Sequence, residues 1–92
     1  MIRMFVRHKV GNFTTWKRGY DSFDATRRRL GVREAAVFHG ASEPEDVTVW
    51  HDFDTIEAAQ AFAKSSELAG AMQRAGVVGT PEIWFASREL RA

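Results

Sequence analysis

The apolar residues of this 92-residue chain follow two different periods, and the order in which these periods alternate limits the folds that the chain can adopt. Over residues 2–10 every second residue is apolar or histidine, which is the period of a β-strand. From residue 13 to Leu30 the apolar residues recur at steps of three and four, which predicts one helix that ends before Gly31. One face of this helix carries an aromatic stripe, made of Phe13, Trp16, Tyr20 and Phe23.

The middle of the chain predicts two more strands. Residues 32–40 and 47–53 are rich in apolar residues, and the segment 40–46 between them is a polar turn. The turn is short enough for a hairpin, so we expect the two strands to pair antiparallel.

A second helix is predicted after this hairpin. Asp54 lies three residues before Glu57, a capping-box pattern that places the start of the helix at Thr55. The serines at 65–66 interrupt it, because their hydroxyls compete for backbone hydrogen bonds, and Gly76 ends it.

Residues 77–81 are predicted as a loop and residues 82–87 as a fourth strand. The resulting order, βαββαβ, is that of a ferredoxin-like α+β fold, a four-stranded antiparallel sheet with both helices on one face. Right-handed crossovers set the strand order as 4-1-3-2. A chain of this length has room for one core, so we expect a single domain over residues 1–92.

The sheet face turned away from the helices would carry three large aromatic residues, Phe5, Trp50 and Trp84. Polar residues of the same strands surround them: Arg3, Arg7, Lys9, Thr48, Asp52 and Glu82. An apolar patch of this size is larger than a monomer usually exposes. We therefore expect a homodimer in which two sheet faces cover each other.

Composition excludes several classes of protein. The absence of cysteine removes thiol catalysis, disulfides and Cys-based metal sites, and no stretch approaches the roughly 18 apolar residues of a membrane span. We expect a cytoplasmic protein with no membrane partner. Residues 1–40 carry a net charge of +6 and residues 41–92 carry −5. Because the basic residues alternate with apolar ones, we expect no nucleic-acid partner, and oppositely charged elements that lie side by side or across the dimer.

Several short strings of the sequence form a pattern known from one superfamily. They are Val6-Arg7-His8-Lys9-Val10, Trp16-Lys17, Phe23-Asp24, Phe53-Asp54, Ser65-Ser66-Glu67-Leu68 and Ala75-Gly76-Val77-Val78-Gly79-Thr80-Pro81-Glu82. On these strings, which lie within residues 2–87, the chain resembles the dimeric α+β barrel superfamily, and within it the small antibiotic biosynthesis monooxygenase-like and cyclase-like proteins. The last string is the most specific.

What the resemblance implies is a homodimeric α+β barrel with a pocket in each subunit between sheet and helices. In the monooxygenase branch this pocket oxidises polycyclic phenols with molecular oxygen and without metal or flavin, so no cofactor is expected. The chain departs from that branch in two places: Phe53 stands where the better-known members have Trp, and the second helix has no His. The catalytic residues are therefore inferred from the chain itself.

Two residues are candidates for catalysis. Strand parity places His8 on the aliphatic face with Met4 and Val6, which we assign to the helix side. There it can take a proton from a ligand as a general base, whereas the alternative is a structural histidine bonded to a backbone carbonyl. Tyr20, on the aromatic stripe, would orient the ligand, because a buried hydroxyl needs a partner.

Six further residues are candidates for binding a substrate: Asn12, Trp16, Phe23, His51, Phe62 and Met72. Aromatic and thioether side chains suit a flat apolar ligand, although such a stripe can equally be core packing. Asn12 can also cap the first helix, and His51 can also close the core. The basic run at 27–29, with Arg33, is interpreted as a solvated helix end.

For a metal ion the topology offers one triplet, His8, His39 and Glu82, which we expect at one rim of the sheet with His51 at the other. No ligand-spacing motif supports this triplet, so no metal is expected.

Three functions remain open at this point. The first is a small-molecule-binding enzyme, a cofactor-independent monooxygenase or cyclase acting on an aromatic, polyketide-like substrate. The second is a non-catalytic ligand-binding or stress-related module of the same fold, and the third is a structural dimer with a filled interior. An open cavity with His8 in its wall favours the first two, and a filled interior favours the third.

Overall fold

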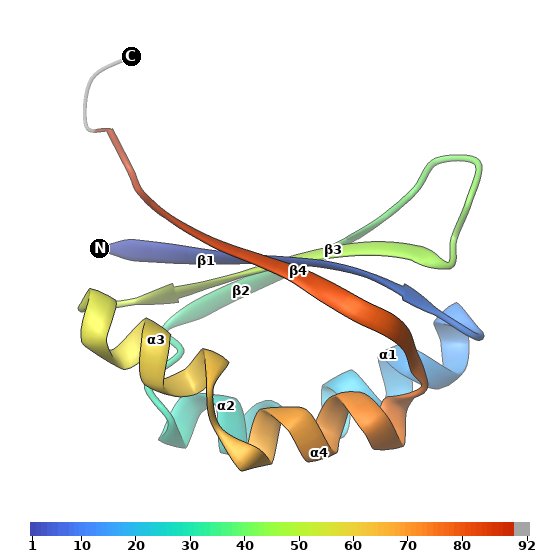
Figure 1. Cartoon of the computed structure of the whole chain (residues 1–92), viewed down its shortest axis with the longest axis horizontal. Helices are drawn as coiled ribbons and strands as arrows, with labels where there is room; N and C mark the ends of the chain where they lie inside the picture. Colours follow the sequence, from blue (N-terminus) through green and yellow to red (C-terminus); the bar gives the residue numbers. More distant parts are fainter. Residues whose placement is uncertain (90–92) are drawn as a thin grey trace.

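The computed structural model describes residues 1–89, which form an antiparallel sheet covered on one face by helices (Figure 1). The elements are β1 (Ile2–Val10), α1 (Phe13–Ser22), α2 (Asp24–Arg29), β2 (Glu34–His39), β3 (Asp46–Phe53), α3 (Ile56–Ala63), α4 (Ser66–Ala75) and β4 (Val77–Ser87). The strands lie in the order β2-β3-β1-β4, so the predicted ferredoxin-like fold and strand order are confirmed. The single domain expected over residues 1–92 includes residues 90–92, which lie outside the described residues.

The first predicted helix is divided in two. The helix expected from residue 13 to Leu30 breaks at Phe23, between α1 and α2. The Ser22 hydroxyl donates to the carbonyl of Gly19 at 2.8 Å, and the Phe23 amide bonds the carbonyl of Tyr20, three residues back. These tighter bonds replace the regular helical ones, so α1 ends at Ser22 and α2 begins at Asp24.

The fourth strand is longer than predicted, because residues 77–81 belong to β4 and not to a loop. Pairing with β1 is irregular between Arg7 and Lys9, opposite Gly79, whose φ of 75° is left-handed. Pro81 is tolerated because β4 is an edge strand. The local preference of Gly, Thr and Pro for a loop is overcome by pairing with β1 on both sides of the irregularity.

Helix starts follow local side-chain chemistry. Asn12 caps α1 by accepting from the amide of Thr15 at 2.9 Å, as its position predicted. At α3 the cap is Thr55, whose Oγ1 accepts from the amide of Ala58, and not the predicted Asp54. Asp54 instead accepts two hydrogen bonds from the Arg33 guanidinium.

The core lies between the sheet and the helices. Met4 and Val6 of β1 are buried there with Val49 of β3 and Phe62 of α3, which confirms that the aliphatic face of β1 faces the helices. No helix among the described residues is long and apolar enough to cross a membrane.

Ion pairs join the two oppositely charged halves of the chain. Arg3 donates two hydrogen bonds to Asp52, and Arg7 donates two to Asp46, in both cases from β1 to β3. The expected neighbourhood of basic and acidic elements therefore exists within one chain.

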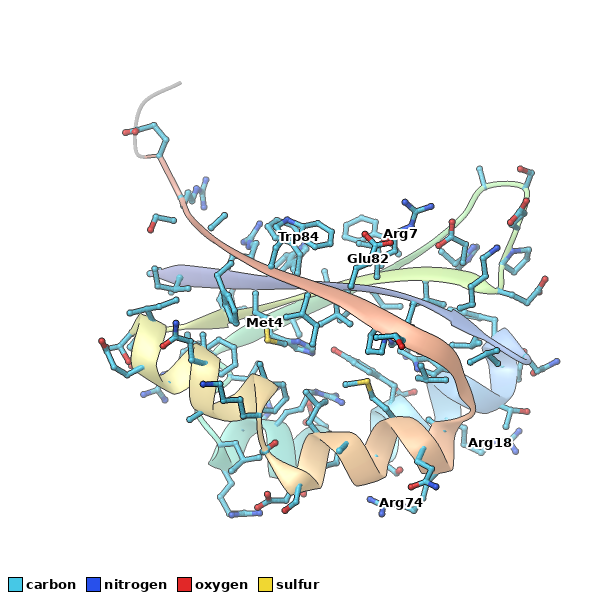
Figure 2. All side chains as sticks on the ribbon, viewed as in Figure 1. Met4, Arg7, Arg18, Arg74, Glu82 and Trp84 are labelled. Atoms are coloured by element: carbon cyan, nitrogen blue, oxygen red, sulfur yellow. The ribbon has the colours of Figure 1, made fainter. Side chains whose placement is uncertain are left out.

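The open face of the sheet carries the predicted aromatic group. Phe5 and Trp84 stack with ring centroids 5.2 Å apart, and the Arg3 guanidinium lies 3.6 Å above the ring of Trp50. Trp84 points away from the helices (Figure 2) and is 43% exposed. Asp52, predicted as part of the polar surround, is buried, because Arg3 covers it.

Candidate functional site

A cavity of about 40 Å³ lies between the sheet and helices α1, α2 and α4. Its walls are mainly apolar, with four side chains that carry polar atoms: His8, Tyr20, Arg27 and His51. Its volume corresponds to about three water molecules, since about 10–15 Å³ of such space holds one. The interior is therefore not completely filled, but the cavity is smaller than an aromatic ring, so the ligand-binding interpretations require its wall to move.

His8 comes from β1 and reaches the cavity because β1 alternates toward the helices. Its side chain is 7% exposed, and neither ring nitrogen has a hydrogen-bond partner among the described residues. The ring packs edge-on against Trp16, with centroids 5.6 Å apart. The alternative prediction, that His8 hydrogen-bonds to a backbone carbonyl, is therefore wrong. Burial lowers the pKa of His8, so the imidazole is neutral at pH 7.

Tyr20 and His51 form a second polar pair in the same cavity. The Tyr20 hydroxyl hydrogen-bonds with Nε2 of His51 at 3.1 Å. Burial, helped by the charge of Arg27, lowers the pKa of His51 to about 3, and burial raises the pKa of Tyr20. Both groups are thus neutral at pH 7, and Nδ1 of His51 is buried with no partner among the described residues. The tautomer of His51 decides whether its Nδ1 donates or accepts a hydrogen bond.

Arg27 lines the cavity, although the sequence does not predict it as a site residue. It was interpreted as part of a solvated helix end, but its side chain lies under the helices and the residue is only 4% exposed. Its guanidinium lies 3.7 Å from the centre of the Tyr20 ring and donates to the Tyr20 carbonyl and to Asp24. The sequence does contain a feature that predicts this burial, because Arg27 continues the stripe of Trp16, Tyr20 and Phe23 at helical spacing.

Of the eight predicted site residues, six line the cavity: His8, Trp16, Tyr20, Phe23, His51 and Met72. Asn12 does not line it, because its side chain caps α1. Phe62 lies behind the wall, where its ring contacts His51 and Phe53 at centroid distances of 5.5 and 5.4 Å. The positions of the six are consistent with the predicted roles, which remain predictions.

The predicted cluster of His8, His39 and Glu82 is wrong. His8 and His39 both lie opposite Val47, but Glu82 pairs with Arg7 and so points from the other face of the sheet. His39 is exposed and packs against Phe13 at 4.7 Å. His51 shares the cavity with His8 and does not mark an opposite rim. Over residues 1–89 no three His, Asp or Glu side chains are grouped closely enough to hold a metal ion.

The chain is similar in structure to several solved proteins. It superposes with a TM-score of 0.83 and 16% identity on a proposed antibiotic biosynthesis monooxygenase from Bordetella bronchiseptica, covering 97% of both chains. With SnoaB, a cofactor-independent oxygenase from Streptomyces nogalater, the TM-score is 0.74 at 10% identity, over 99% of this chain and 97% of that one. A proposed antibiotic biosynthesis monooxygenase from Nitrosomonas europaea gives 0.73 at 13%, over 96% and 98%.

No family model matches the sequence, and no curated protein does. At such low identities the structural similarity establishes the fold. The resemblance to antibiotic biosynthesis monooxygenase-like α+β barrel proteins is confirmed at that level.

Proposed function

We propose that this protein is a cofactor-independent monooxygenase that acts on a flat phenolic, polyketide-like substrate bound in the cavity of each subunit. The observation that carries the proposal is His8, a buried neutral imidazole with both nitrogens unpartnered in the cavity wall. A buried polar group without a partner costs stability, so it is typical of a position kept for a ligand. The activity of SnoaB, which has the same fold, supports the same chemistry.

The cavity residues suit removal of a proton from a phenol with an acidic methylene. The free lone pair of His8 accepts the proton, and the fixed charge of Arg27 favours the resulting anion. Tyr20 and His51 hold the ligand by hydrogen bonds. The carbanion then reacts with O₂ to give a peroxide, which breaks its O–O bond: one oxygen becomes the new carbonyl and the other leaves as water. The methylene carbon thus loses four electrons, and these reduce the two oxygen atoms of O₂ to the level of water.

Dithranol, a tricyclic phenol with such a methylene, tests this proposal. We expect one O₂ consumed per quinone formed, at a rate unaffected by metal chelators. His8→Ala should lower kcat/KM by about a hundredfold, the usual contribution of a general base. It should lower stability by only about 1 kcal/mol, because no protein partner is left unsatisfied. His39→Ala, an exposed histidine outside the cavity, is the control and should leave kcat/KM unchanged.

Two outcomes would contradict the proposal that this protein is an enzyme with His8 as its base. Binding of dithranol without O₂ uptake would favour the second candidate, a non-catalytic ligand-binding or stress-related module, which the small and mainly apolar cavity also suits. A strong loss of stability in His8→Ala with unchanged binding would make His8 structural.

We further propose that the protein is a homodimer in the cytoplasm, joined through the open sheet faces. The stacked pair of Phe5 and Trp84, together with the exposed Phe38 on the same face, supports this arrangement. The absence of cysteine is compatible with a reducing compartment.

A further inference from the structure

A second, larger hollow lies on the outer side of the helices and shares part of its lining with the cavity. This groove of about 460 Å³ runs between α1–α2 on one side and α4 on the other. Its outer lining is polar: Ser22, Thr26, Arg29, Ser66, Glu67 and Arg74. Four residues line the cavity as well as the groove: Gly19, Phe23, Ala71 and Ala75. Because the two spaces share these walls, only small side chains and the Phe23 ring separate them.

The sizes of the two spaces show how a ligand would have to lie. The cavity of about 40 Å³ is well below the roughly 150 Å³ of an engineered apolar cavity that binds benzene. A ring that reaches His8 must therefore displace the wall at Phe23 and Ala71, and any larger part of the same molecule extends into the groove.

The groove carries an excess of positive charge. Arg29 lies 3.9 Å from Glu67, so its charge is largely balanced. Arg74 forms no ion pair within residues 1–89, and its guanidinium lies along α4 over Gly70, where an added Cβ would be 3.0 Å from Nη1. Figure 2 shows Arg18 of α1 at the same end of the helix layer as Arg74. The unpaired charge of Arg74 therefore favours the binding of an anion in the groove.

We propose that cavity and groove form one two-part site, whose ligand places a phenolic ring in the cavity, toward His8, and a carboxylate on a flexible arm in the groove, against Arg74. The proposal rests on the proposed function, since it names the class of ligand for that cavity. The buried, unpartnered nitrogens of His8 indicate the ring end, and the unpaired Arg74 indicates the carboxylate end. We therefore expect this site to bind phenolic acids more tightly than neutral phenols of the same ring size.

Two matched compounds test the proposal: 4-(6-hydroxynaphthalen-2-yl)butanoic acid and its uncharged amide. By calorimetry we expect the acid to bind about tenfold more tightly than the amide, with the difference falling as salt is added. Arg74→Gln should remove most of that difference and leave the affinity for the amide unchanged. Arg28→Gln is the control, because Arg28 is an exposed arginine of α2 that does not line the groove, and it should preserve the difference.

A third variant separates this proposal from the proposed function. His8→Ala should weaken both compounds equally, and the NMR signals of the His8 ring should shift when either binds. If the acid and amide bind equally well and Arg74→Gln changes neither, while the His8 signals shift, the two-part site is overturned and the phenol cavity stands. If neither compound binds or moves the His8 signals, both proposals are contradicted.

Discussion

At the scale of single residues, burial changes the protonation of His51. It is 3% exposed, its ring contacts Tyr20 and Phe62, and the nearby guanidinium of Arg27 opposes a second positive charge. The Asp52 carboxylate acts in the opposite direction but is the weaker influence, because Arg3 neutralises it. His51 therefore stays neutral in the folded protein across the range in which an unfolded chain would protonate it.

This difference predicts a loss of stability in mild acid. The pKa of His51 is about 3 in the folded protein and 6.5 for an ordinary histidine, so the unfolded state takes up the proton first and the protein loses stability as the pH drops below 6.5. Between pH 7 and pH 5 the loss from His51 is about 2 kcal/mol, and the lowered pKa of His8 adds to it. Urea unfolding at the two pH values measures this change.

The matched variants are His51→Gln and His39→Gln. His51→Gln should reduce the change between pH 7 and pH 5 by about 2 kcal/mol, whereas His39→Gln, at an exposed position, should not alter it. The same change in His51→Gln as in the unmodified protein would show that folded His51 takes up its proton over the same pH range as it does in the unfolded chain.

At the scale of the elements, the crossing of α1 and α4 depends on Gly19. A Cβ added there would lie 3.0 Å from the Cβ of Ala75 and 3.4 Å from its Cα, which is part of the α4 backbone. Gly70 offers a matched comparison within α4, because a Cβ there would meet only the flexible end of the Arg74 side chain.

We expect opposite effects from alanine at these two glycines. Gly19→Ala should destabilise the protein by about 1 kcal/mol, because forcing the helices apart outweighs the gain in helix propensity. Gly70→Ala should stabilise it by up to about 1 kcal/mol. Thermal or urea unfolding of both variants measures the difference, and a stabilised Gly19→Ala would show that α4 moves away at little cost.

At the scale of the whole molecule, the open sheet face predicts a dimer. Sedimentation equilibrium at about 10 µM should give twice the chain mass of 10.4 kDa. Trp84→Glu should give a monomer, because a dimer would bury the new carboxylate without a partner. Gln73→Glu adds the same charge at an exposed position of α4 and should leave the dimer intact. A monomeric unmodified protein, or a dimeric Trp84→Glu, would place the interface elsewhere.

Much of the candidate site was predictable from the sequence, because strand parity and helical spacing are local properties. The period of two in β1 placed His8 on the helix side with Met4, and the stripe of α1 placed Trp16 and Tyr20 above it. Arg27 was misjudged because a charged residue in a basic run resembles a solvated helix end. Its burial depends on the ring of Tyr20, against which the guanidinium packs, and on the break at Phe23, after which α2 begins.

The sequence alone determined the order of the elements, the face on which each strand residue lies and the polarity of each half of the chain. These follow from the period of the apolar residues, which a single segment carries by itself. Tertiary structure decided the pairing that extends β4 back to Val77 and the isolation of the His8 nitrogens. It also decided the volume of the cavity, because an empty space depends on how closely α4 approaches α1 at Gly19 and Ala75, two residues 56 positions apart.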